Sequence, residues 1–128
     1  MIILSNQKVE CVMPVMKSGK RHAEMSAAAL DLVAARFRVL GEASRLKLIQ
    51  ALNGSERSVT DLIDTTGLTQ ANASRHLQTL TASGILKRRK RGLHVLYSIA
   101  DPRIFDLCEH VCGSLQKRIE THARAFEG

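Results

Sequence analysis

Three cysteines are the residues of this chain most suited to chemistry, and two of them are closely spaced. Cys108 and Cys112 stand four residues apart toward the C-terminal end, and Cys11 stands near the start. On a helix, side chains at i and i+4 share one face, with Cβ atoms about 5–6 Å apart. A disulfide needs Cβ atoms about 3.8 Å apart, whereas a soft ion bridges two thiolates without that compression. The pair therefore favours capture of a metalloid or soft metal over a local disulfide.

Other uses of these thiols stay open. Oxidation to a sulfenate, persulfide bridging or a disulfide between subunits would use the same side chains. At about 100° per residue, Cys108 falls on the apolar stripe of an amphipathic helix and Cys112 at its edge. Packing as small hydrophobic residues is therefore an alternative role. Cys11 has enough intervening chain to supply a third sulfur.

The composition limits what kind of protein holds these thiols. With 128 residues, of which 45% are hydrophobic, the chain is long enough for one compact domain and too short for a multi-domain enzyme. Nineteen Lys and Arg against twelve Asp and Glu give a net charge of +7, which predicts a polyanionic partner, nucleic acid first. The chain shows no nucleotide-binding loop, catalytic carboxylate pair or nucleophile elbow. We expect a DNA-binding protein that is not an enzyme.

The location is expected to be cytoplasmic and reducing. No stretch approaches the roughly 20 apolar residues of a membrane span, and the start of the chain lacks the pattern of a signal peptide. An odd number of cysteines in such a chain argues against a disulfide framework. We therefore expect no membrane partner and free thiols.

The chain divides into an arm and a domain. Residues 1–26 lack sustained periodicity and are expected to form a mobile arm, followed by a DNA-binding and dimerisation domain over residues 27–128. In that domain, apolar residues at three- and four-residue steps predict helices over about 27–40, 42–52, 58–66 and 70–83. The period then changes to about two over 85–99, with a turn at Arg91-Gly92, which predicts a β-hairpin. Asp101 and Pro102 predict the start of a long last helix.

The predicted order is α-α-α-α-β-β-α, a mainly α protein with a β-hairpin. A short turn between the third and fourth helices makes this a winged helix-turn-helix. The charge distribution supports a winged helix-turn-helix that binds DNA. No acidic residue lies between Thr65 and Ala100, while Arg75 and all of residues 87–91 are basic. A basic run is often only a solvated surface. Here it lies on the hairpin directly after the candidate recognition helix, which indicates DNA binding.

Three segments resemble the ArsR/SmtB family of winged-helix repressors. LGEASRL at 40–46 is similar to the start of that family's second helix. QANASRHLQTLTASG at 70–84 resembles its recognition helix, with Ser83 where alanine is usual, and LKRRKRGLHVLYSI at 86–99 resembles its wing. The resemblance covers residues 27–120 and leaves the arm unexplained. It implies a homodimer, formed through the first and last helices, that binds an inverted-repeat operator in double-stranded DNA and is released by an inducer.

The expected DNA contacts form two groups. Near the start of the 70–83 helix, backbone N–H groups face phosphate and exposed side chains reach base edges in the major groove. The candidates there are Thr69, Gln70, Asn72, Ser74, Arg75 and His76. His76 either contacts DNA or packs against the body. Wing residues are expected to contact phosphates or the minor groove, although strand alternation turns some of them back toward the body. The wing candidates are Arg88, Arg89, Lys90 and Arg91.

The sensor patterns known in the resembling family are missing. The third helix has no C-x-C motif, since residues 58–62 read SVTDL, and no cysteine near Gln50 is available for a redox disulfide with the last helix. If Asp101 is aligned with the first ligand of the family's zinc site, the other three positions hold Arg103, Ser114 and Lys117.

Cys108 and Cys112, with Cys11, are the remaining candidates for sensing. We therefore expect a repressor that needs no cofactor and is released when these thiols bind arsenite, antimonite or a soft metal ion. A thiol-redox or reactive-sulfur sensor using the same cysteines is one alternative. A constitutive DNA-binding protein whose cysteines only pack is another.

Overall fold

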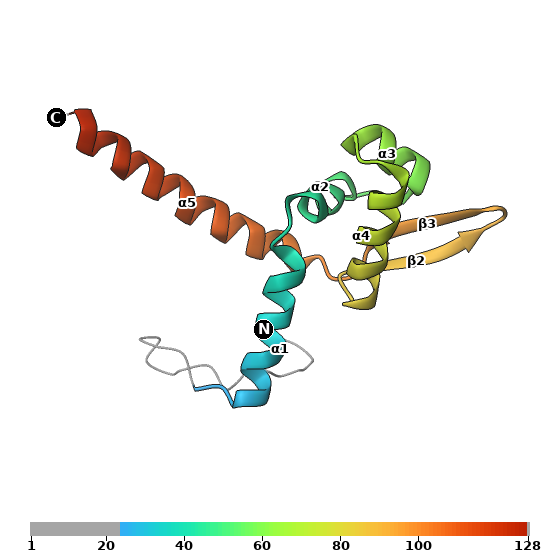
Figure 1. Cartoon of the computed structure of the whole chain (residues 1–128), viewed down its shortest axis with the longest axis horizontal. Coiled ribbons are helices and arrows are strands. Elements are labelled where there is room, and N and C mark those ends of the chain that lie inside the picture. Colours follow the sequence, from blue (N-terminus) through green and yellow to red (C-terminus); the bar gives the residue numbers. More distant parts are fainter. Residues whose placement is uncertain (1–23, 128) are drawn as a thin grey trace.

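The computed structural model describes residues 24–127 of the chain. Its elements, in order, are α1 (Ala27–Leu40), α2 (Ala43–Ala51), β1 (Arg57–Ser58), α3 (Val59–Thr66), α4 (Gln70–Ala82), β2 (Leu86–Arg91), β3 (His94–Ile99) and α5 (Arg103–Glu127) (Figure 1). The helices lie close to their predicted bounds, and the mainly α winged helix-turn-helix is confirmed. The predicted arm, apart from residues 24–26, and with it Cys11, lies outside the described residues.

Local signals in the sequence position the helix-turn-helix. Ser58 Oγ accepts a hydrogen bond from the N–H of Asp61 at 3.2 Å, and Thr69 Oγ1 accepts one from the N–H of Asn72 at 3.2 Å. Each bond satisfies an N–H that has no partner within its helix. Gly67 ends α3 at φ 77, a left-handed conformation that favours glycine. The turn between α3 and α4 is thus determined by nearby residues.

The sheet contains the predicted hairpin and one strand that the sequence did not predict. β2 and β3 pair antiparallel, and β1 adds to the other side of β3, giving the order β1-β3-β2. β1 has two residues, too few to display a two-residue period. The turn lies one residue later than the predicted Arg91-Gly92. Arg91 pairs with His94, so the turn consists of Gly92, at φ 63, and Leu93.

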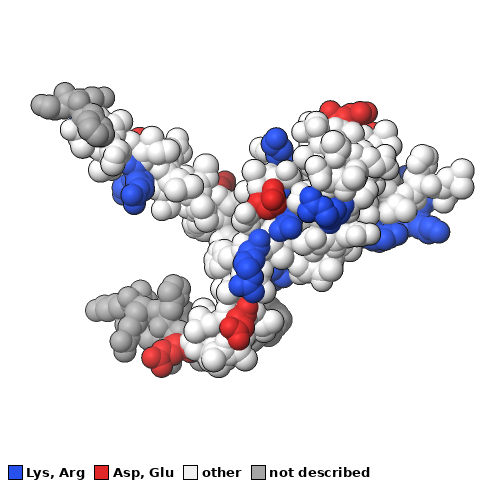
Figure 2. All heavy atoms as spheres, in the orientation of Figure 1, with Lys and Arg blue, Asp and Glu red and all other residues white. Residues whose placement is uncertain are grey.

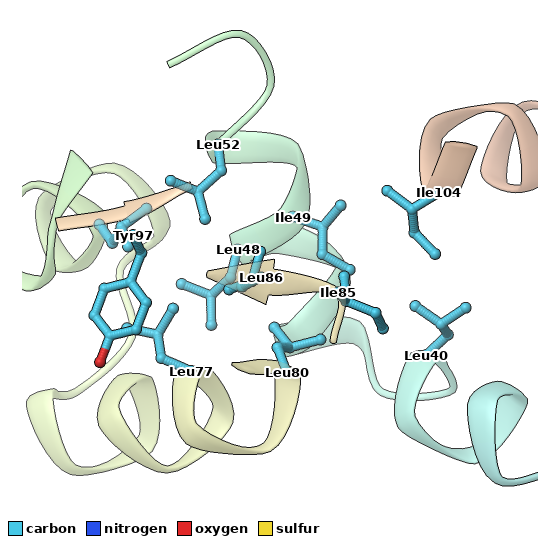
Figure 3. Close-up of a cluster of buried hydrophobic side chains, with 11 residues drawn as sticks. Leu40, Leu48, Ile49, Leu52, Leu77, Leu80, Ile85, Leu86, Tyr97 and Ile104 are labelled. Atoms are coloured by element: carbon cyan, nitrogen blue, oxygen red, sulfur yellow. The ribbon is translucent and has the colours of Figure 1, made fainter. Parts of the chain in front are cut away.

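The core joins the helices to the base of the wing. Figure 3 shows aliphatic side chains from α2 and α4 meeting those at the start of β2, with Tyr97 from β3 closing one side. Leu48, Leu62, Leu77, Leu80 and Ile85 are fully buried. This packing fixes α4 against the body by one face and leaves its other face exposed.

The last helix leaves the body after its first turns. Ile104 packs into the core at 4% exposure, whereas Val111, Leu115 and Ile119 are 47%, 55% and 66% exposed. Figure 1 shows most of α5 projecting away from the other elements. The apolar stripe expected to be buried is therefore uncovered within one chain. In the part of the chain that the structure describes, no helix is both long enough and apolar enough to span a bilayer.

Candidate nucleic-acid interface and thiol groove

The recognition helix presents a polar face opposite its core contacts. Ala73, Leu77 and Leu80 are each 0% exposed and anchor α4, while Asn72 and Arg75 point to solvent and Ser74 is half-buried. Arg75 Nη2 donates a hydrogen bond to Asn72 Oδ1 at 3.0 Å. This bond holds two side chains suited to base edges beside each other on the first turns of the helix.

His76 belongs to the core, which corrects its inclusion among the DNA contacts. The side chain is 4% exposed, and its Nδ1 accepts a hydrogen bond from Arg45 Nε at 3.2 Å. Arg45 also donates from Nη1 to the carbonyl oxygen of Val39 at 3.0 Å. One guanidinium on α2 therefore connects the end of α1 to the recognition helix. The sequence did not reveal this connection because its partners are far apart along the chain.

The wing carries a dense row of cations. Arg88, Lys90 and Arg91 are exposed along β2, and Figure 2 shows Lys and Arg side chains along the projecting hairpin. Leu93, fully exposed at the turn, marks its tip. A narrow, positively charged projection of this kind matches the phosphate backbone beside a groove.

Arg89 forms an ion pair with Glu56, an acidic residue that no local sequence pattern connects with the wing. Its Nε donates to Glu56 Oε2 at 2.5 Å and its Nη2 to Glu56 Oε1 at 2.8 Å. The hydrogen bond from Arg89 holds the pKa of the Glu56 carboxyl below its ordinary value of 4.5. Glu56 therefore stays ionised and neutralises one cation of the wing at neutral pH.

The cysteine pair lines an open groove between α2 and α5. The groove has a volume of about 550 Å³, with Cys108 half-buried and Cys112 exposed. Its walls are formed by Leu46, Ile49, Gln50 and Asn53 on one side and by Phe105, Asp106, Cys108, Glu109 and Cys112 on the other. Leu46 is 39% exposed, because it lines this groove and is not enclosed in the core.

The groove is lined by the two thiols and by two carboxylates, those of Asp106 and Glu109. Among residues 24–127, no group of three or more His, Cys, Asp and Glu side chains is placed to hold a metal ion. Gln50 lies in the groove wall on α2, so α2 offers no thiol there for a disulfide with α5. The arrangement suits a ligand that needs two sulfur donors from one helix.

Comparison with known proteins agrees with this fold. The model of the arsR family of bacterial regulatory proteins matches residues 42–88, from the start of α2 into the wing. A probable mercury resistance operon repressor of Streptomyces lividans is 33% identical over 94 residues, which are 73% of this chain and 75% of that protein. The chain belongs to the arsR family. It is a DNA-binding transcriptional repressor and not an enzyme.

Solved structures resemble this arsR-family protein along most of its length. The homodimeric winged helix-turn-helix domain of Mb0332 from Mycobacterium bovis is 32% identical, with a TM-score of 0.64, over 72% of this chain and 88% of that domain. The antimony-specific repressor AntR is 25% identical, with a TM-score of 0.69, over 85% of this chain and 99% of AntR. The chain spans 53–75% of the length of the first curated relatives that it matches.

Replacing Glu56 by Gln is expected to strengthen DNA binding by this arsR-family protein by a few-fold. The change releases Arg89 from its ion pair and gives the wing one more available cation. The slope of log affinity against log salt should steepen by about 0.9 if Arg89 then reaches one phosphate. Fluorescence anisotropy at several salt concentrations measures both effects. Asp64→Asn removes the same charge from the exposed surface of α3 as a control. An unchanged slope in Glu56→Gln would count against this assignment of Arg89.

Acid is expected to destabilise the repressor through His76. Burial, with help from nearby Arg75 and Arg45, holds the pKa of His76 below its ordinary value of 6.5, and Glu42 opposes this only weakly. The unfolded chain therefore takes up the proton first, and stability that is complete above pH 6.5 declines as the pH falls below that value. Melting temperatures at about pH 7.5 and about pH 5.5, on either side of the ordinary histidine pKa, should differ by a few degrees. His76→Asn should reduce this difference in melting temperature, and the exposed control His94→Asn should keep it. An equal difference in the parent protein and both variants would contradict the prediction.

Proposed function

We propose that this protein is a homodimeric repressor that leaves its operator when Cys108 and Cys112 bind arsenite, antimonite or a soft metal ion. The observation that carries the proposal is the position of both thiols in one accessible groove between α2 and α5. Thiolates are soft donors that select thiophilic ions. Relatives whose names refer to mercury resistance and to antimony add support.

Dimerisation is supported by apolar surface that one chain leaves uncovered. The exposed stripe of α5 is accompanied on α1 by Leu30, Leu32 and Phe37, which are 53%, 69% and 52% exposed. Apolar residues in such numbers on projecting helices are typical of a subunit interface. The homodimeric Mb0332 domain shares the same fold.

DNA contact is assigned to α4 and the wing. We expect the cap residue Thr69 and its neighbour Gln70 to set the helix against phosphate, and Asn72, Ser74 and Arg75 to reach base edges. The exposed wing cations Arg88, Lys90 and Arg91 supply affinity for phosphate. Because the proposed partner is operator DNA, we expect the site of action to be the cytoplasm.

Coupling between the groove and DNA passes through α2. A ligand held by the α5 thiols contacts the α2 wall of the groove, and α2 carries Arg45, which is hydrogen-bonded to His76 on the recognition helix. A change in the spacing of α2 and α5 therefore alters the position of α4 relative to the dimer helices. Two recognition helices fit half-sites about 34 Å apart, so a small rotation breaks the match.

The test is release of the reduced protein from its own promoter DNA, followed by fluorescence anisotropy. Titration with arsenite, antimonite or cadmium is expected to lower operator affinity. Release only by an oxidant or a persulfide donor, reversed by dithiothreitol, would replace the proposal with redox or reactive-sulfur sensing. No release by any of these reagents would leave a constitutive DNA-binding protein with packing cysteines.

A further inference from the structure

The number of thiols in the groove sets a condition on its ligand. Trivalent arsenic forms three covalent bonds, and inorganic arsenite needs three sulfur donors to replace all of its oxygens. The groove supplies Cys108 and Cys112. Within residues 24–127, no cluster of three or more His, Cys, Asp and Glu side chains adds a further ligand for a metal ion. Two thiols therefore suit a ligand in which one of the three bonds to arsenic is already made to another group. They suit less well a ligand that needs a third sulfur donor.

The size and walls of the groove indicate what occupies that third valence. A volume of about 550 Å³ is far larger than a bare ion requires. Leu46 on α2 and Phe105 on α5 provide apolar surface in the same groove as the thiols, whereas Ile49 beside them is only 2% exposed and adds little. Phe105 precedes Cys108 by three residues, a spacing that places both side chains on neighbouring turns of one helix face. An apolar group attached to thiol-bound arsenic would therefore lie against these side chains.

Building on the proposed thiol sensing, we propose that the groove selects a trivalent arsenical that carries one apolar organic substituent. Such a compound has the form R–As(OH)₂ in water. Cys108 and Cys112 each form one As–S bond, the two As–O bonds break, and two water molecules leave with the thiol protons. The As–C bond is retained and arsenic stays trivalent, so no oxidant or reductant is required. The substituent R occupies the space between α2 and α5.

The test compares four probes on the full chain carrying Cys11→Ser, which removes the third thiol of the sequence. The probes are phenylarsine oxide, methylarsonous acid, arsenite and mercuric chloride, and the readouts are intact mass and release from operator DNA. We expect one phenylarsenic group per chain and half-maximal release at a concentration about tenfold lower than for arsenite, since ring burial adds to the As–S bonds. Arsenite or mercuric ion acting as well as phenylarsine oxide in this variant would overturn the inference and leave the proposed function standing. Release by none of the four probes would overturn both.

A second variant tests the apolar part of the groove separately. Gln50 lines the groove from an exposed position on α2, so Gln50→Trp fills the space without entering the core. It should weaken the response to phenylarsine oxide by about tenfold, because the ring loses its apolar contacts, and should leave the response to methylarsonous acid nearly unchanged. An equal response of Gln50→Trp to the two organic probes, matching the parent protein, would contradict the role of the groove. Thermal melting and operator affinity without ligand check that the variant is folded.

Discussion

A repressor carrying Cys108→Ser and Cys112→Ser together is expected to bind its operator normally and to stay bound when arsenite or phenylarsine oxide is added. Serine has nearly the size of cysteine, and both positions lie outside the buried core, so fold and dimer should be retained. Its hydroxyl is a hard, weak ligand that does not replace a thiolate for a soft ion. The loss of affinity that such couplings produce, about 5- to 150-fold, should disappear. Anisotropy titrations with and without ligand measure both properties.

The single variants show which of the three thiols the response requires. Cys108→Ser and Cys112→Ser should each lose most of the response to phenylarsine oxide, because one thiol cannot chelate. Cys11→Ser should keep the response to phenylarsine oxide. If the double variant were still released by arsenite and by phenylarsine oxide, the sensing role of the groove would be wrong, while the assignment of the recognition helix and wing would be unaffected.

Removing the available wing cations is the second change with a large expected effect. Arg88, Lys90 and Arg91 are exposed on β2, whereas Arg89, which is also exposed, is paired with Glu56. Replacing all three by Ala should lower DNA affinity about 100-fold at physiological salt and flatten the salt slope by about 0.9 for each lost phosphate contact. The loss should be similar for operator and random DNA, because phosphate contacts carry little sequence information.

Two further variants distinguish the effect of the wing cations from the effect of net charge and from the recognition of bases. A control with Lys47, Lys117 and Arg124 changed to Ala removes the same charge from α2 and α5 and should weaken binding only slightly. Arg75→Ala on α4 should instead reduce the preference for operator over random DNA, by about 1–3 kcal/mol if it pairs with one base. Equal losses in the wing variant and the charge control would show that the wing has no special place in the complex.

The sequence predicts those parts of the fold that nearby residues determine. Ser58, Thr69 and Gly67 act within a few residues of their own positions, so the bounds of α3 and α4 were accessible from caps and turns. The hairpin also followed from its own periodicity, although its turn lies one residue later than expected. β1 was not predicted because its two residues are in a strand only through their pairing with β3.

The parts of the site that depend on contacts between distant residues were not predicted. Arg89 and Glu56 are separated by 33 positions, and Arg45 and His76 by 31. No local pattern connects such residues, so the sequence alone predicts that Arg89 is available to DNA and leaves two roles open for His76. The groove likewise exists only because residues of α2 and of the first turns of α5 line the same space around the thiols. The cysteine spacing predicts the thiol chemistry, and the structure adds the open space beside the thiols.

Ligand binding at Cys108 and Cys112 and binding of the protein to operator DNA are expected to weaken each other. Thermodynamic linkage requires that the factor by which a ligand weakens DNA binding equal the factor by which DNA weakens ligand binding. The most direct measurement is therefore the affinity of the repressor for phenylarsine oxide, determined by competition with a small dithiol, with and without saturating operator DNA. We expect operator to weaken arsenical binding by about 5- to 150-fold, matching the loss of DNA affinity in the reverse titration. Equal arsenical affinity with and without operator would contradict the account.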